Sequence, residues 1–236
     1  MRNISLFLFS CFLTLIVSLP ATASEQEGEF RVGVVGEYSN ANTSGDGGII
    51  YGSFGGLLAG YNANVNDRVW YDLSGKYIYG EYLATSKNGC YSTGKLRAIG
   101  KLGTTYDYGV KLKPFIGLGI NYEMWDLRGA NNAYTTDYIL PIGLMAEKET
   151  AYGQFGVDVQ YEYVLQKEIY TTEAGSTGAT SSFGGSSNVE LGISYEPKNL
   201  PIGIRPYYRY EHWTKKEDGW DATTINTCGL EIFYHF

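Results

Sequence analysis

The sequence predicts an all-β protein, a closed, antiparallel, up-and-down β-barrel of about ten strands that crosses a membrane. Three observations lead to this prediction. Apolar and polar residues alternate through most of the chain, and the breaks between these stretches alternate between short and long. After residue 23, no segment shows helical periodicity or is apolar enough for a spanning helix. Eight strands are the alternative, since one hairpin could lie outside the membrane.

Strands are expected where apolar and polar residues alternate with a period of two. The clearest case is the stretch 152–166, in which Val157 and Val159 face one way while Asp158 and Gln160 face the other. In a membrane barrel the apolar set contacts lipid and the polar set faces the lumen. The predicted strands are residues 30–40, 49–62, 68–82, 93–106, 111–126, 136–147, 152–166, 189–196, 202–213 and 224–236.

The breaks between the strands predict the topology. Short breaks fall at residues 63–67, 107–110, 148–151 and 197–201. The others, at residues 41–48, 83–92, 127–135, 167–188 and 214–223, are mostly longer and rich in Gly, Ser, Thr, Asn and Asp. Short turns at one end and longer loops at the other are typical of an up-and-down membrane barrel, and an even strand number brings both termini to the short-turn end.

Three prolines, Pro114, Pro141 and Pro206, fall inside predicted strands. Proline lacks the N–H group that a ladder bond needs. We therefore expect bulges or register breaks at these positions.

The last predicted strand ends the chain on Phe236, with Leu230, Ile232 and Tyr234 on the same side. A closing strand of this pattern resembles the carboxy-terminal strand of small bacterial outer-membrane β-barrel proteins, the porin-like and opacity-type superfamily. The resemblance concerns the architecture of the whole mature chain and involves no family-specific motif. It implies a place in the outer membrane of a Gram-negative cell, contact with outer-membrane lipid, and recognition of Phe236 by the barrel assembly machinery.

The amino terminus has the features of a secretory signal. Arg2 precedes an apolar run from Ile4 to Leu19, and the small residues Ala21-Thr22-Ala23 form a cleavage site. We expect a signal peptide at residues 1–23 and a single barrel domain at residues 24–236. The formal net charge of −7 argues against a nucleic-acid partner, which would require a basic face. No cofactor and no metal site are predicted.

Charged residues on the polar side of the strands are expected to line the lumen. Inside a narrow, low-dielectric lumen such charges must pair, and arginine forks on carboxylates are the favourable solution. The sequence therefore predicts a largely plugged barrel. The predicted ion-pair network consists of Arg205, Arg209, Glu190, Glu196, Glu211, Glu231, Lys95, Arg97, Lys101, Asp158 and Glu162, and the same face also carries Arg31, Glu37, Asp72, Lys76 and Glu123.

Three functional interpretations follow. A plugged barrel would act structurally or at the cell surface, as an adhesin does, with the Ser/Thr/Gly-rich loop 167–188 contacting an extracellular ligand. Alternatively, a narrow channel for small solutes or ions would follow the cationic strip of Lys95, Arg97 and Lys101. Third comes an outer-membrane protease or lipid hydrolase. The hydrolase hypothesis is weak because the parity that turns Glu211 inward turns the neighbouring His212 toward lipid.

Tryptophans and cysteines complete the predictions. Trp70, Trp125 and Trp213 lie near predicted strand ends, which indicates an interfacial aromatic girdle. Cys90 falls in a predicted outer loop and Cys228 in the last strand. A disulfide between them and two independent thiols both remain open.

Overall fold

The computed structural model describes residues 28–43, 49–84, 90–127, 131–173, 176–183, 186–213 and 223–236. The predicted signal peptide lies outside these residues. All regular secondary structure in the described part is β-strand, in one antiparallel sheet. The strands are β1 (Gly28–Thr43), β2 (Ile49–Asn64), β3 (Val69–Ala84), β4 (Cys90–Thr104), β5 (Tyr106–Asp107), β6 (Lys111–Leu127), β7 (Asn131–Glu149), β8 (Gly153–Glu173), β9 (Ser176–Phe183), β10 (Ser187–Pro197), β11 (Ile202–Trp213) and β12 (Thr223–His235).

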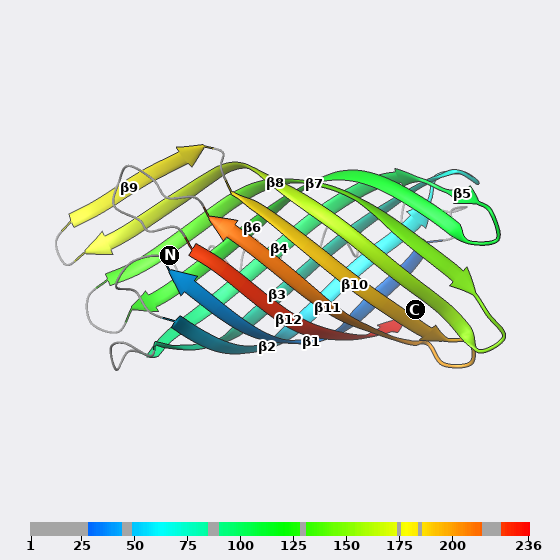
Figure 1. The fold of residues 1–236 in the computed structure, drawn as a ribbon, viewed down its shortest axis with the longest axis horizontal. Coiled ribbons are helices and arrows are strands. Elements are labelled where there is room, and N and C mark those ends of the chain that lie inside the picture. The colour runs from blue at the N-terminus through cyan, green and yellow to red at the C-terminus, as the bar shows by residue number, and fades with distance from the viewer. Residues whose placement is uncertain are drawn as a thin grey trace.

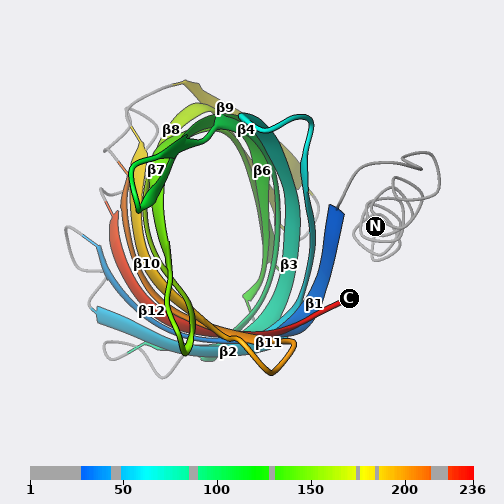
Figure 2. The same cartoon turned by 90° about the vertical axis from the view of Figure 1, so that its right-hand side faces the viewer.

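The sheet closes on itself, because β1 pairs with β12 and β8 pairs with β10 (Figures 1 and 2). Twelve strands are labelled, but two of them do not form separate staves of the barrel wall. β5 is a short piece that pairs only with β6, and β9 and β10 lie end to end along β8. The wall therefore has ten strands, which confirms the predicted barrel and excludes the eight-stranded alternative.

The short turns all lie at one end of the barrel, on the right in Figure 1. Each is held by local hydrogen bonds. In the β2–β3 turn, Asn66 Oδ1 accepts from the backbone N–H groups of Arg68 and Val69, both at 2.9 Å. The turn after β5 needs a glycine, because Gly109 has a φ of 81°. The carboxy terminus lies at this end too, where Phe236 N–H donates to Phe30 O at 2.8 Å.

The two faces of the wall differ in polarity as the alternation predicts. On β8, Val157 is 58% exposed on the outer face, whereas Gln160 is 2% exposed inside. The other strands likewise carry apolar side chains outward, among them Leu57, Leu118 and Ile193. An apolar outer face suits contact with lipid. Within the described residues, no helix is long and apolar enough to span a membrane.

Two of the three strand prolines interrupt a ladder without shifting its register, and the third lies where a ladder ends, instead of the expected bulges. Pro206 coincides with a gap in β10–β11 pairing, and Pro141 with a gap in β6–β7 pairing, yet the register is the same on both sides of each gap. Pro114 stands beside the last β4–β6 pair. A missing N–H thus removes a bond locally, while the neighbouring pairs hold the register.

The bulge lies elsewhere, on β8. Tyr138 pairs with Gln166 and Ile139 with Val164, so Leu165 is the extra residue. A single inserted residue reverses which side chains face inward. Before the bulge the even-numbered residues of β8 face the lumen, and after it Lys167 does, at 5% exposure.

The prediction that residues 167–188 form a loop is wrong for most of that range. β8 continues to Glu173 and pairs there with β9, so the two strands form a hairpin that extends the wall at the end opposite the short turns (Figure 1). Residues 167–188 lack the apolar alternation by which strands were predicted from the sequence. They form strands because they pair with β7 and with each other.

Candidate functional site

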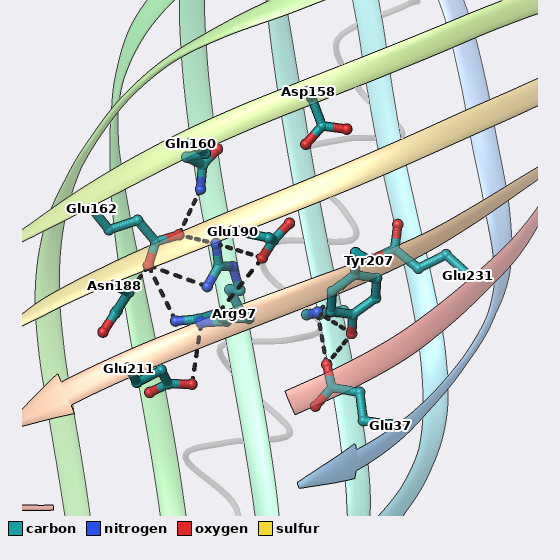
Figure 3. A network of polar contacts seen from close by, with 12 residues as sticks. Glu37, Arg97, Asp158, Gln160, Glu162, Asn188, Glu190, Tyr207, Glu211 and Glu231 are labelled. Carbon is teal, nitrogen blue, oxygen red and sulfur yellow. Dashed lines mark hydrogen bonds and ion pairs between the residues drawn. The ribbon is translucent and has the colours of Figure 1, made fainter. Parts of the chain in front are cut away.

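The predicted network residues all lie on inward-facing positions, in the lumen or around its cavities. The centre of the network is Glu162 on β8, which is fully buried. Its carboxylate accepts from Arg97 on β4 and from Arg209 Nη2 on β11, the latter at 3.1 Å. Asn188 Nδ2 also donates to it at 3.0 Å, and Gln160 supplies a further hydrogen bond (Figure 3). Two guanidinium groups and two amides thus compensate one buried carboxylate.

A second group of ion pairs lies next to this centre, toward the short-turn end. Arg205 on β11 contacts Asp158 and Glu190, both at 2.7 Å, and Glu231 at 3.2 Å. Glu190 links the two groups, because its Oε2 lies 3.6 Å from Arg97 Nη2. The ion pairs around Glu162 and those around Arg205 therefore form one connected network through Glu190.

A third contact crosses the lumen from another direction. Lys76 on β3 donates to Glu37 Oε1 at 2.8 Å and to the hydroxyl of Tyr207 on β11 at 2.9 Å. Tyr207 in turn donates to Glu37 (Figure 3). β3 and β11 are separated in the wall by β2, β1 and β12. Contacts between strands so far apart show that side chains bridge the lumen. We refer to Arg97, Glu162, Glu190, Arg205, Tyr207 and Arg209 as the plug.

Two further ion pairs lie toward the loop end. Lys95 Nζ is 3.1 Å from Glu123 Oε1, and Lys167 Nζ is 2.9 Å from Asp137 Oδ1. Glu211 is held on its own strand by Arg209 Nε at 3.1 Å. Glu196 lies at the other end of the barrel, where its ion-pair partner within the described ranges is His235, with Nε2 at 3.7 Å. Lys101 is the member of the predicted network whose side chain forms no ion pair or hydrogen bond with any described residue; its Nζ lies over the Phe115 ring.

The prediction of a tryptophan girdle is wrong for all three residues. Trp70 is 4% exposed and its indole N–H donates to Thr104 O inside the barrel at 3.3 Å. The Trp125 ring stacks on Tyr82 at 5.0 Å, and Lys167 Nζ lies 3.6 Å from the centre of the Trp213 ring. Each tryptophan is two residues from an inward-facing carboxylate on the same strand, so the alternation itself turns it inward.

Several lumen residues were not predicted. Asp137 and Lys167 pair with each other, but Lys167 reaches the lumen only because of the bulge at Leu165. Gln160 was predicted to face the lumen, but the predicted network contains charged residues alone; Asn188 was assigned to the loop 167–188, although it is buried inside the barrel. Tyr207 lies between Arg205 and Arg209 at the same parity, and the alternation alone predicts that it faces inward.

The plug separates two cavities. The larger one, about 420 Å³, lies between the plug and the short-turn end, and the smaller one, about 60 Å³, lies toward the loop end. Arg97 and Lys76 line both cavities and so belong to the partition between them.

The positions of the histidines bear on the hydrolase hypothesis. His212 lies on the outward parity of β11, with Tyr208 and Tyr210, away from the lumen carboxylates. His235 lies inside at the short-turn end, with Nδ1 at 2.6 Å from Glu29. Among the described residues, no group of three or more His, Cys, Asp or Glu side chains is placed to hold a metal ion.

The remaining sequence predictions concern the ends of strands. Cys228 is a free, exposed thiol on the outer face of β12, whereas the Cys90 side chain lies outside the described part. Phe236 is exposed, with its ring 5.9 Å from that of Phe30.

Comparison with known proteins supports the fold alone. No family model and no curated sequence matches the chain. The outer membrane protease OmpT from Escherichia coli is similar in structure, with a TM-score of 0.57 at 8% identity over 90% of this chain and 97% of that chain. Neisserial surface protein A has a TM-score of 0.44 at 16% identity, over 89% of this chain and 100% of that chain. Ail of Yersinia pestis has a TM-score of 0.36 at 14% identity, over 89% of this chain and 99% of that chain. This chain has the fold of the bacterial outer-membrane β-barrels.

Proposed function

We propose that this protein is a closed outer-membrane barrel that acts at the cell surface, by contacting an extracellular ligand with the loop-end extension of its wall. The observation that carries the proposal is the plug. Arg97 and Glu162 join strands that β6 and β7 separate in the wall, and Lys76 and Tyr207 join strands on the other side.

The plug argues against conduction on energetic grounds. Removing one partner from a buried ion pair costs about 3–5 kcal/mol, because the other charge is left uncompensated. Glu162 has four partners and Arg205 three carboxylates, so a permeating ion would have to displace several such contacts together. Function is then expected outside the lumen.

The β8–β9 hairpin is the best candidate for the contact surface. β8 pairs with β7 as far as Thr172 and with β9 as far as Glu173, so three strands continue beyond the end of β11 at Trp213. In the part of the chain that is described, β9 pairs only with β8. An edge strand offers a row of backbone donors and acceptors to an extended peptide. Residues 174–189 contain no charge and no proline that would block such pairing.

The proposal includes two partners of the barrel itself. Outer-membrane lipid would contact the apolar outer face, on which Val157, Leu118 and Ile193 are exposed. The barrel assembly machinery would recognise the closing strand, whose Leu230, Ile232, Tyr234 and Phe236 side chains form an exposed apolar row. The signal peptide at residues 1–23 would direct export.

The experiment shortens the hairpin without disturbing the lumen. Tyr170 and Ala179 are directly paired, so replacing residues 171–178 by Asn-Gly would close β8 and β9 with a two-residue turn. The replacement keeps Lys167 and its ion pair with Asp137. We expect proteoliposomes that carry this variant to lose binding to cultured cells and to extracellular-matrix coatings.

A matched control makes the same change at the other end. Asn64 and Trp70 are also directly paired, so Asn-Gly can replace residues 65–69 of a short turn. This control should bind as the unaltered protein does. Equal binding by the unaltered protein and the shortened hairpin would refute the proposal.

A further inference from the structure

The large cavity below the plug is a second candidate site, independent of the cell-surface role. Its lining runs from Arg97 and Glu190 at the plug to Asn64 and Lys111 at the short-turn end, so its entrance faces the periplasm if the loops face outward. Small side chains leave the space: Ala59, Ala63, Ser74, Gly75 and Ser194 all line it. A volume of about 420 Å³ is in the lower part of the range of small-ligand pockets, about 300–1,000 Å³.

The cavity wall carries charges of both signs, and several of them are already paired, as Arg31 is with Asp72 and Lys113 with Glu147. Lys101, Lys111 and Lys113 lie on the adjacent strands β4 and β6. Farther round the wall, β8, β10 and β12 carry an acidic group that contains Asp158, Glu190, Glu196 and Glu231, and Arg205 neutralises part of it. A small molecule in the cavity would therefore be attracted by its negative end to one side and by its positive end to the other.

Lys101 is the group that is free to bind an anion. Asp72 stands directly opposite it in the β3–β4 register, but the Asp72 carboxylate instead accepts from Arg31 Nη2 at 2.8 Å. Asp72 Oδ1 has no hydrogen-bond partner, and Lys101 Nζ lies over the Phe115 ring at 4.7 Å. Lys101 thus lines the cavity without an ion pair to any residue that is described.

Glu196 is the corresponding group on the acidic side. Its carboxylate has no arginine or lysine within ion-pair distance in the described chain, and its contact at 3.7 Å is to His235 Nε2. Glu196 also lines the cavity. Together, an ammonium group without an ion pair to a described residue and a carboxylate without a permanent cation lie on different strands around one cavity.

From this arrangement we infer that the cavity binds a small zwitterion, a free amino acid or a short peptide, from the periplasm. Its carboxylate accepts from Lys101, and its ammonium group lies toward Glu196 and Asp158. The volume suits a dipeptide. The Trp70 ring lines the cavity beside Lys113, with Phe115 packed behind it, and would contact the apolar part of the ligand.

Titration calorimetry with the refolded chain from Ser24 in detergent tests the inference, with Ala-Ala as the probe. We expect Ala-Ala to bind, and its N-acetylated and its C-amidated forms to bind about tenfold or more weakly, because each has lost one charge-assisted contact. Lys101→Met and Glu196→Gln should each weaken Ala-Ala binding to a similar extent. Lys148→Met changes an exposed lysine of β7 outside the cavity and should leave binding unchanged.

Three outcomes would overturn the inference. One is no heat of binding from Ala-Ala with a correctly folded barrel, which the shifted mobility of an unheated sample reports. Another is unchanged affinity in both Lys101→Met and Glu196→Gln, which would place the ligand elsewhere. The third is equal binding of Ala-Ala and its N-acetylated form, which would make the site a simple anion site. None of these outcomes depends on whether the hairpin binds cells.

Discussion

The plug and the cavity below it lie in the same barrel. Side chains fill the lumen at the plug, whereas the cavity leaves about 420 Å³ of the lumen empty. At the plug, Arg97, Arg205 and Arg209 each contact at least two carboxylates. In the cavity, Lys101 contacts none of the described carboxylates and Lys113 contacts only Glu147, at 2.7 Å, on the neighbouring strand β7. Charges at the plug therefore reach across the lumen, whereas those in the cavity stay near the wall.

The difference comes from side-chain size at inward positions, since the strand number is the same at both depths. Glycines at the plug make room for large side chains that cross it. A Cβ atom at Gly229 would lie 2.2 Å from Cζ of Tyr207, and one at Gly192 would lie 2.4 Å from Asp158 Oδ1. In the cavity, the inward positions of Ala59, Ala63, Ser74, Gly75 and Ser194 carry small side chains or none. The number of strands thus sets the maximum width of the lumen, and the size of the inward side chains determines how much of that width stays empty.

The largest effect is expected from Glu162→Ala in the plug. The substitution leaves Arg97 and Arg209 buried without their shared carboxylate, so we expect a loss of about 3–5 kcal/mol in the free energy of unfolding. Urea unfolding of the protein in lipid vesicles, followed by tryptophan fluorescence, measures it.

The control for this prediction is Glu149→Ala. Glu149 pairs with Lys111 at 2.7 Å on the exposed rim, where solvent screens the ion pair, so this substitution should leave the free energy of unfolding nearly unchanged. Equal destabilisation by the two substitutions would mean that the plug is no more important to stability than a rim contact.

An intermediate effect is expected from Gly229→Ala. The added methyl group would collide with the Tyr207 ring and displace it from Lys76 and Glu37, at a cost of about 1–3 kcal/mol for overpacking. Gly36→Ala is the matched control, because no atom lies within 4 Å of a Cβ built there. The same unfolding assay should separate the two, and a neutral Gly229→Ala would show that the lumen has room at this depth.

The smallest effect is expected from Lys101→Met in the cavity. Lys101 has no ion pair to lose, and methionine keeps an apolar contact with Phe115. The remaining loss is a cation–π contact of about 0.5–1 kcal/mol, so we expect a change in unfolding free energy below about 1 kcal/mol. A loss as large as that of Glu162→Ala would contradict the contrast between plug and cavity.

The strands and the inward parity of most charges could be predicted from the sequence, because alternation is a local property. Trp213 faces inward because it lies two residues after Glu211 on the same strand. The girdle prediction failed because it was based on the position of the tryptophans near strand ends. Lys167 could not be assigned, since the bulge at Leu165 reverses the parity and leaves no local signal. The partners within the plug were also beyond prediction. That Arg97 meets Glu162 depends on how the closed wall staggers β4 against β8.

Single-channel recording of the refolded chain from Ser24 in a planar bilayer tests most directly whether the plug closes the barrel. We expect an inserted protein that shows no steady openings. Steady openings of the unaltered protein that disappear when Lys95, Arg97 and Lys101 are neutralised would contradict this expectation and would make the barrel a selective channel.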